Sequence, residues 1–128
     1  MPLVQPSIET LRGFGSFTRV ITLGKKYESK PIKAFVFSSI SKKAGLRVGF
    51  AVTRGMRKAV QRNLIKRLMR EAFRTKREEF SARIDPGRLV EIVFLYNGDT
   101  KSPSTQGRFI PINQALAELS ATINVVRP

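Results

Sequence analysis

One stretch of the sequence, Arg54 to Arg74, combines the spacing of a packed helix with an excess of positive charge. It contains eight Lys or Arg residues and a single acid, Glu71, so it carries +7 of the chain's net charge of +15. Its apolar residues recur at steps of three and four, which places them on one side of a helix. They are Val60, Leu64, Ile65, Leu68, Met69 and Ala72. The stretch therefore predicts a long amphipathic helix whose apolar side faces the core.

The polar side of this helix is predicted to form a basic stripe. Its members are also separated by steps of three and four, opposite the apolar line: Asn63, Lys66, Arg67, Arg70, Arg74 and Arg77. Like charges at this spacing repel one another, and Arg57 and Lys58 near the helix start oppose the helix dipole. A solvated charged face is the simplest alternative. Because almost no acid compensates the stripe, we favour contact with nucleic-acid phosphates, which release counterions on binding.

The amino-acid composition excludes several kinds of catalytic site. The chain has no Cys and no His, so it can build neither a thiol nucleophile, nor an imidazole base, nor a Cys/His zinc site. The nine acids are scattered. The adjacent pair Glu78 and Glu79 points about 100° apart on a helix, whereas a two-metal nuclease site requires clustered carboxylates. We therefore expect no catalytic residue and no metal ligand on this chain.

Length and terminal composition predict one domain and a cytoplasmic location. The 128 residues fit a single domain, in which residues 1–10 are expected to form a flexible arm. No apolar run approaches twenty residues, and the N-terminus lacks the apolar stretch of a signal peptide. The absence of Cys leaves no disulfide framework. A protein oligomer is not expected.

Local signals predict three features ahead of the first long strand. Ser7 is expected to cap a short turn. Ser16 is expected to cap a brief helix that Gly24 ends. Its apolar face would comprise Phe17, Val20 and Ile21. Residues 25–30 have the composition of a polar, basic turn.

Alternating and apolar segments predict three strands. They are expected at 31–40, 46–53 and 89–96, the first two as a hairpin and the third at the centre of the sheet. In the first strand Lys33, Phe35 and Phe37 share one face, and both phenylalanines fit either a core or a stacking surface for unpaired bases. The long helix is expected to end near residue 82.

A loop and a last helix are expected to complete the chain. Residues 97–107 have loop composition, and Pro111 is expected to begin the helix. Its apolar face would comprise Ile112, Ala115, Leu116, Leu119 and Ile123. Together the elements predict an α/β (α+β) two-layer sandwich with a mixed sheet of three to four strands. The long basic helix would form a βαβ crossover if the second and third strands are parallel.

The central helix resembles the signature of a known family. The run from Lys58 to Phe73, KAVQRNLIKRLMREAF, is similar to the A-V-x-R-N-x-x-K-R-x-x-R-E helix of the bacterial ribonuclease P protein subunit, and Leu46 to Thr53 is similar to its preceding strand. The resemblance covers roughly residues 11–80. Two positions depart from the family pattern: Leu64 replaces a basic residue, and Arg57 replaces a glycine. Because Leu64 borders the apolar face, we expect it to pack in the core.

The resemblance implies a fold, a function and a site. The fold would be ribosomal protein S5 domain 2-like, with a left-handed crossover. The function would be that of an RNA-binding cofactor, which binds the catalytic RNA of ribonuclease P and the 5′ leader of precursor tRNA. The RNA would perform the cleavage with magnesium. The implied RNA-binding residues are Arg54, Arg57, Lys58, Arg62, Asn63, Lys66, Arg67, Arg70 and Arg74. The implied leader cleft comprises Phe17, Ile21, Phe35, Phe37 and Lys66.

Two other classes of function stay open at the level of sequence. A structural RNA-binding protein of the ribosomal type has the same composition, and only the pattern from Arg62 to Glu71 argues against it. A protein-only nuclease is disfavoured by the scattered acids. Reconstitution with and without a ribonuclease P RNA separates the three classes.

Overall fold

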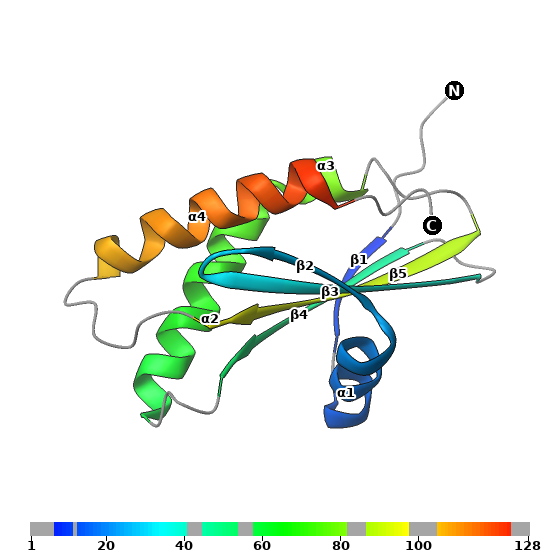
Figure 1. The fold of residues 1–128 in the computed structure, drawn as a ribbon, viewed down its shortest axis with the longest axis horizontal. Helices are drawn as coiled ribbons and strands as arrows, with labels where there is room; N and C mark the ends of the chain where they lie inside the picture. The colour runs from blue at the N-terminus through cyan, green and yellow to red at the C-terminus, as the bar shows by residue number, and fades with distance from the viewer. Residues whose placement is uncertain are drawn as a thin grey trace.

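A five-stranded mixed sheet forms the centre of the computed structural model, which describes residues 7–11, 13–40, 45–53, 58–81, 87–97 and 105–123. In chain order the elements are β1 (Ser7–Thr10), α1 (Phe14–Leu23), β2 (Lys25–Ser29), β3 (Ile32–Ile40), β4 (Gly45–Val52), α2 (Ala59–Arg74), α3 (Arg77–Ser81), β5 (Arg88–Tyr96) and α4 (Thr105–Thr122). The strand order is β1-β4-β5-β3-β2. The sheet lies between α1 on one side and α4 on the other (Figure 1). The predicted α/β fold class is confirmed, with five strands instead of three to four.

The central strand β5 joins the two halves of the sheet. It pairs in parallel with β4, so β4, α2, α3 and β5 form the predicted βαβ crossover. On its other side it pairs antiparallel with β3, from Ile32 opposite Tyr96 to Ile40 opposite Arg88. The central position predicted for this strand is therefore confirmed. The predicted hairpin of β3 and β4 is wrong, because β5 lies between them.

The two edge strands occupy segments that were predicted to be non-regular. Residues 7–10 pair in parallel with β4 as β1, and the Leu11 N–H extends the contact by donating to the Val48 carbonyl at 2.9 Å. The predicted turn after Ser7 and the predicted arm are therefore wrong for residues 7–10, while residues 1–6 lie outside the described residues. The predicted basic turn at 25–30 is mostly β2, which pairs antiparallel with β3.

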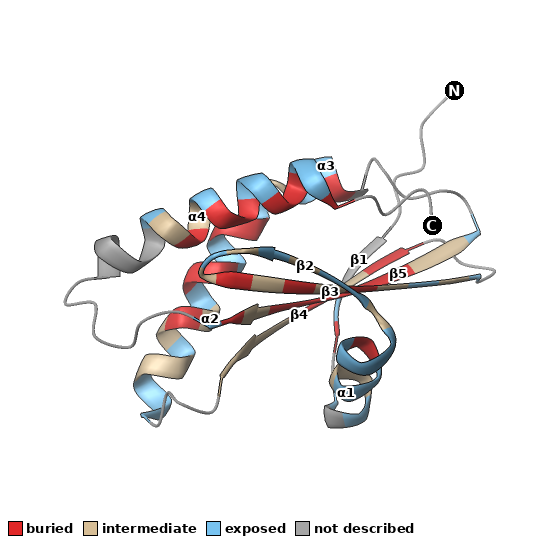
Figure 2. Ribbon diagram, in the orientation of Figure 1, coloured by how far each residue is buried: buried red, intermediate tan, exposed pale blue. Residues whose placement is uncertain are grey.

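The main core lies between the sheet and helices α2, α3 and α4 (Figure 2). The three inner strands β3, β4 and β5 contribute alternate residues to it, as the pleat requires, and β2 contributes Tyr27. In β3 these are Ile32, Ala34 and Val36, which alternate with Lys33, Phe35 and Phe37 on the other face, as the sequence pattern predicted. A group of aromatic rings fills its centre, in which Phe94 lies 5.8 Å from Phe50 and 5.8 Å from Phe73, centroid to centroid.

The long helix is shorter than predicted. It begins at Ala59 and ends at Arg74, and a turn separates it from α3. In that turn the Thr75 hydroxyl donates to the Ala72 carbonyl at 2.9 Å, and the Lys76 N–H donates to the Phe73 carbonyl at 2.8 Å. The turn redirects the chain, which lets Phe80 enter the core beside Phe73, with centroids 5.3 Å apart.

The first and last helices, in contrast, begin earlier than predicted. Gly13, with φ of 92°, precedes α1, and no side chain caps the helix, so the expected Ser16 cap is wrong. Its end at Gly24 is confirmed by the Gly24 N–H, which donates to the Val20 carbonyl at 2.8 Å. Helix α4 begins at Thr105 and contains Pro111 in its interior. Its predicted apolar face is confirmed, because Ile112, Ala115, Leu116, Leu119 and Ile123 are all buried.

Candidate nucleic-acid interface

The basic stripe lies along the outward side of α2. The helix buries Ile65, Leu68, Met69, Ala72 and Phe73 against the sheet and α4. On its other side Lys58, Asn63, Arg67, Arg70 and Arg74 are exposed, whereas Arg62 and Lys66 are half-buried. The predicted Arg54 and Arg57 lie outside the described residues. The structure thus places seven of the nine predicted RNA-binding residues on one helix and its start.

Two apolar residues of α2 test the predicted helical wheel. Leu64 is half-buried and packs against the main core, as its place at the border of the apolar face predicted. Val60 is 80% exposed, so its predicted core position is wrong. It lies in the first turn of α2, before the helix passes over the sheet.

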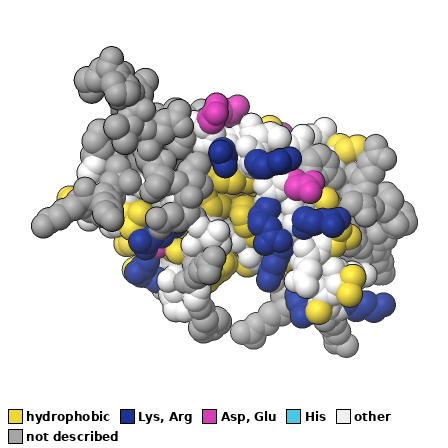
Figure 3. Space-filling view, turned by 180° about the vertical axis from the view of Figure 1, so that it is seen from behind, with side chains coloured by type: hydrophobic (Ala, Val, Ile, Leu, Met, Phe, Trp, Pro, Cys, Tyr) yellow, Lys and Arg dark blue, Asp and Glu magenta, His cyan; other side chains and the backbone are white. Residues whose placement is uncertain are grey.

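Four basic residues of α2 have no ionic partner among the described residues. Lys66, Arg67, Arg70 and Arg74 form no ion pair within the described part of the chain, and the first turn of α2 has no acid. From behind, Lys and Arg side chains gather beside apolar surface (Figure 3). Such unpaired cations at helical spacing repel one another and are relieved by a polyanion.

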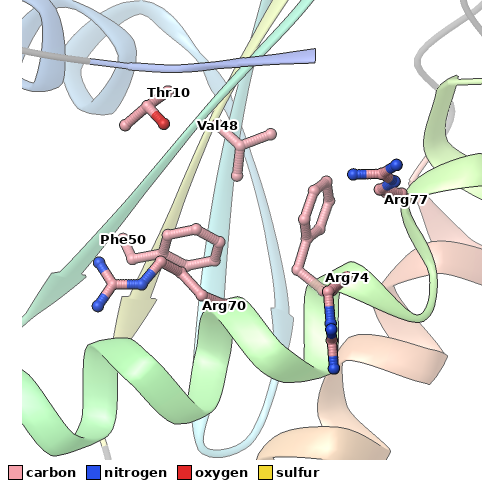
Figure 4. A pocket seen from close by; sticks show the side chains of 7 residues that line it. Thr10, Val48, Phe50, Arg70, Arg74 and Arg77 are labelled. Carbon is pink, nitrogen blue, oxygen red and sulfur yellow. The ribbon is translucent and has the colours of Figure 1, made fainter.

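A hollow opens where the basic side of α2 approaches the sheet edge. It is lined by side chains from four elements, β1, β4, α2 and α3: Thr10, Val48, Phe50, Arg70, Phe73, Arg74 and Arg77 (Figure 4). Its floor is apolar, and three arginines stand around it. Sequence patterns did not single out Thr10, Val48 or Phe50, because the contact of α2 with β4 and β1 joins residues far apart in the chain.

The predicted aromatic residues lie on the opposite face of the sheet. Phe17 of α1 meets Phe35 and Phe37 of β3 in a second cluster, together with Ala51 around buried Leu11, Val20 and Val93. All three phenylalanines are half-buried. They are therefore neither fully enclosed core residues nor freely exposed rings.

A glycine in β4 gives Phe17 its position. A Cβ added at Gly49 would lie 2.4 Å from Phe17 Cζ and 2.9 Å from Cε2. Any larger residue at Gly49 would therefore push the ring away from the sheet. The close approach of α1 to β4 depends on this missing side chain.

The other two predicted cleft residues belong to helices on opposite faces of the sheet. Ile21 is 37% exposed on α1, so it is not a core residue. Lys66 belongs to α2, which packs on the sheet face opposite α1. The structure therefore brings Phe17, Phe35 and Phe37 together, and it separates them from Lys66.

An ion pair between exposed Arg19 and buried Glu91 fastens α1 over the aromatic face. Glu91 of β5 is 1% exposed, and the Arg19 Nη2 group donates to both of its carboxylate oxygens, at 2.7 and 2.6 Å. Arg47 is the cross-strand neighbour of Glu91 in the β4–β5 ladder. No sequence pattern joins Arg19 to Glu91, although an acid inside an otherwise apolar strand is a signal for such a pair.

Among the described residues, no three or more His, Cys, Asp or Glu side chains gather into a possible metal site. No helix of the described ranges has both the length and the apolar content that crossing a membrane requires.

Comparison with known proteins gives a consistent family. The sequence model of the family described as Ribonuclease P matches residues 6–118. The ribonuclease P protein component of Desulfovibrio desulfuricans is 38% identical over 69 residues, which span 54% of this chain and 53% of the relative. That of Finegoldia magna is 37% identical over 75 residues, 59% of this chain and 64% of the relative. The matched segments thus span about half to two thirds of these relatives.

Solved structures agree on the fold. The RNase P protein of Staphylococcus aureus superposes with a TM-score of 0.60 at 16% identity, covering 92% of this chain and 97% of that chain. The RNase P protein from Thermotoga maritima superposes with a TM-score of 0.58 at 21% identity, covering 89% and 96%.

Proposed function

Because the chain belongs to the ribonuclease P protein family, we propose that it is the RNA-binding protein cofactor of a ribonuclease P ribonucleoprotein in the cytoplasm. In this role it binds the catalytic RNA and helps that RNA hold precursor tRNA while the 5′ leader is removed. The chain would act as one protein copy. Its contribution would be binding and positioning.

The observation that carries this proposal is the uncompensated stripe on α2. Exposed Arg67, Arg70 and Arg74 have no acidic partner within the described residues. Guanidinium groups suit phosphate oxygens in geometry as well as in charge. Each phosphate that they neutralise releases counterions, so binding gains free energy that falls with rising salt. A helix built in this way is suited to a polyanionic partner.

The aromatic face supports a second contact, with the single-stranded leader. Phe17, Phe35 and Phe37 are half-buried around one cluster, so part of each ring remains accessible to unpaired bases. Lys33 shares their face of β3 and adds positive charge. We propose this face as the leader-binding surface, without the predicted Lys66, which lies across the sheet.

We place the cleavage chemistry on the RNA partner. The chain has no His or Cys, and its described acids do not gather at one point. Magnesium ions would therefore be held by the RNA, and the chain's arginines would lower phosphate repulsion around them.

Reconstitution tests the proposal directly. Precursor tRNA with a full leader and precursor tRNA with a one-nucleotide leader are incubated in magnesium with a ribonuclease P RNA, the protein, or both. We expect the protein to raise kcat/KM of the RNA, with a larger effect on the long leader, and to cleave nothing alone. Cleavage by the protein without RNA would contradict the proposal.

A structural RNA-binding protein of the ribosomal type is the alternative function. Such a protein would have the same basic stripe, but it would not change the rate at which the RNA cleaves precursor tRNA. Equal kcat/KM with and without the protein, despite tight RNA binding, would favour this alternative.

A further inference from the structure

The hollow beside α2 has a geometry that a purely structural surface does not need. Arg70, Arg74 and Arg77 are spaced by four and three residues, and all three line it. Across from them lie Val48 and Phe50 of β4 (Figure 4). The hollow therefore combines a cationic rim with an apolar floor.

The rim has no anion of its own. None of the residues that line the hollow is acidic, and its three arginines form no ion pair within the described residues. Three arginines line one small hollow, and their like charges repel one another. An oxyanion that accepts from their N–H groups removes this repulsion and suits their planar donor geometry.

The floor offers a rigid aromatic ring. Phe50 is half-buried, whereas the rings that hold it, Phe73 and Phe94, are buried. Phe94 stacks on Phe50 with centroids 5.8 Å apart, and Phe73 meets it edge-on at 6.1 Å. Such a fixed ring, with part of its surface open to the hollow, is a platform on which a base can stack.

We propose that this hollow binds one unpaired nucleotide of the RNA partner, with its base on Phe50 and its phosphate on Arg70, Arg74 and Arg77. Charge complementarity favours a phosphate, and the apolar floor favours an attached base over a free phosphate ion. This inference rests on the proposed function, because RNA is the ligand in both. The site lies on the face of the sheet opposite Phe17 and Phe35, so it is distinct from the proposed leader surface.

Two oligomers of equal charge separate stacking from phosphate binding. Two fluorescently labelled oligomers are used: an oligouridylate of nine nucleotides and an abasic ribose-phosphate oligomer of the same length. The full chain is titrated into each at the same salt concentration, and binding is followed by fluorescence anisotropy. The affinity for the oligouridylate divided by the affinity for the abasic oligomer measures the contribution of base contacts. Phe50→Leu keeps apolar volume but removes the ring, and we expect it to lower that ratio by roughly 5-fold or more while abasic affinity stays constant. Thermal unfolding confirms that the variant is folded.

Matched variants locate the phosphate contact and separate the two proposals. Arg74→Gln with Arg77→Gln removes two rim charges, and Lys58→Gln with Arg67→Gln removes two charges elsewhere on α2. We expect the rim pair to weaken both oligomers more than the control pair does. An unchanged ratio in Phe50→Leu, or equal losses in the two charge pairs, overturns the nucleotide site but leaves RNA binding intact. No affinity for either oligomer overturns the proposed function itself.

A second measurement decides the matter if Phe50→Leu does not fold. An oligouridylate carrying 5-iodouridine is crosslinked to the unaltered chain by light, and the joined peptide is identified by mass spectrometry. Crosslinks at Phe50 or Phe73 support the site. Crosslinks confined to Phe17, Phe35 or Phe37 overturn it.

Discussion

Replacing Arg19 by Met is expected to destabilise the fold, because it leaves the buried Glu91 carboxylate without its cationic partner. The Glu91 side chain is 2% exposed, whereas that of Arg19 is 46% exposed. Removing one partner of a fully buried pair costs about 3–5 kcal/mol of unfolding free energy. Water reaches Arg19, which screens the pair, so we place Arg19→Met lower, at about 2–3 kcal/mol. For a domain of this length that lowers Tm by roughly 6–15 °C.

A double-mutant cycle identifies the cause of the loss. Tm and urea unfolding are measured for Arg19→Met, for Glu91→Leu and for the double variant. The double variant should recover much of the stability, because it removes the charge together with its partner. Arg67→Met removes an exposed arginine that has no partner in the described chain, and it should change the unfolding free energy by less than about 0.5 kcal/mol. Equal, small effects of Arg19→Met and Arg67→Met would refute the reasoning and would point to Arg47 as a sufficient partner for Glu91.

Three further substitutions test the packing on both faces of the sheet. Leu64→Arg should lower the unfolding free energy by about 1–3 kcal/mol, since it places a charge against the core. An unchanged Tm together with tighter RNA binding would show instead that residue 64 faces solvent. Gly49→Ala should cost about 1–3 kcal/mol, because its Cβ would meet the Phe17 ring, and Phe17→Leu in the same chain should restore part of the loss in thermal denaturation. Phe35→Ala should weaken binding of long-leader precursor tRNA by about 1–3 kcal/mol with little change in Tm; a loss of about 3–5 kcal/mol in folding alone would instead identify a core residue.

The sequence allowed prediction of those elements whose apolar residues determine their structure. The alternation in β3 and the three-and-four spacing in α2 and α4 reflect burial against one core, so their faces were predictable. Leu64 is the clearest case, since its place on the helical wheel alone predicted its contact with the core.

Elements held mainly by backbone pairing were not predictable in this way. β2 reads Lys-Lys-Tyr-Glu-Ser and presents a single apolar residue, Tyr27, to the core, so its strand character comes from the ladder with β3. The wrong β3–β4 hairpin has a related cause. β5 enters between the two strands from a position more than 35 residues after β4, and local alternation contains no information on that insertion.

The site was predicted in the same uneven manner. A basic stripe on one helix is a local pattern, and the structure places it on α2 as the spacing indicated, except for Arg77, which lies on α3 after the turn. The hollow around Phe50 requires β1, β4, α2 and α3 to meet, and the pairing of Arg19 with Glu91 joins α1 to β5, so no window of the sequence contains either.

The salt dependence of binding to a ribonuclease P RNA tests the central claim most directly. Lys66, Arg67 and Arg70 on α2 are changed together to Gln, and a control chain carries the same change at Lys25, Lys26 and Lys30 on the opposite edge of the sheet. Affinity is measured over a range of salt concentrations for both variants and the unaltered chain. We expect the α2 variant to lower the slope of log K against log salt by about 2 to 3, while the control retains most of the original slope. Equal slopes for the α2 variant and the unaltered chain would contradict the assignment of the α2 stripe to RNA.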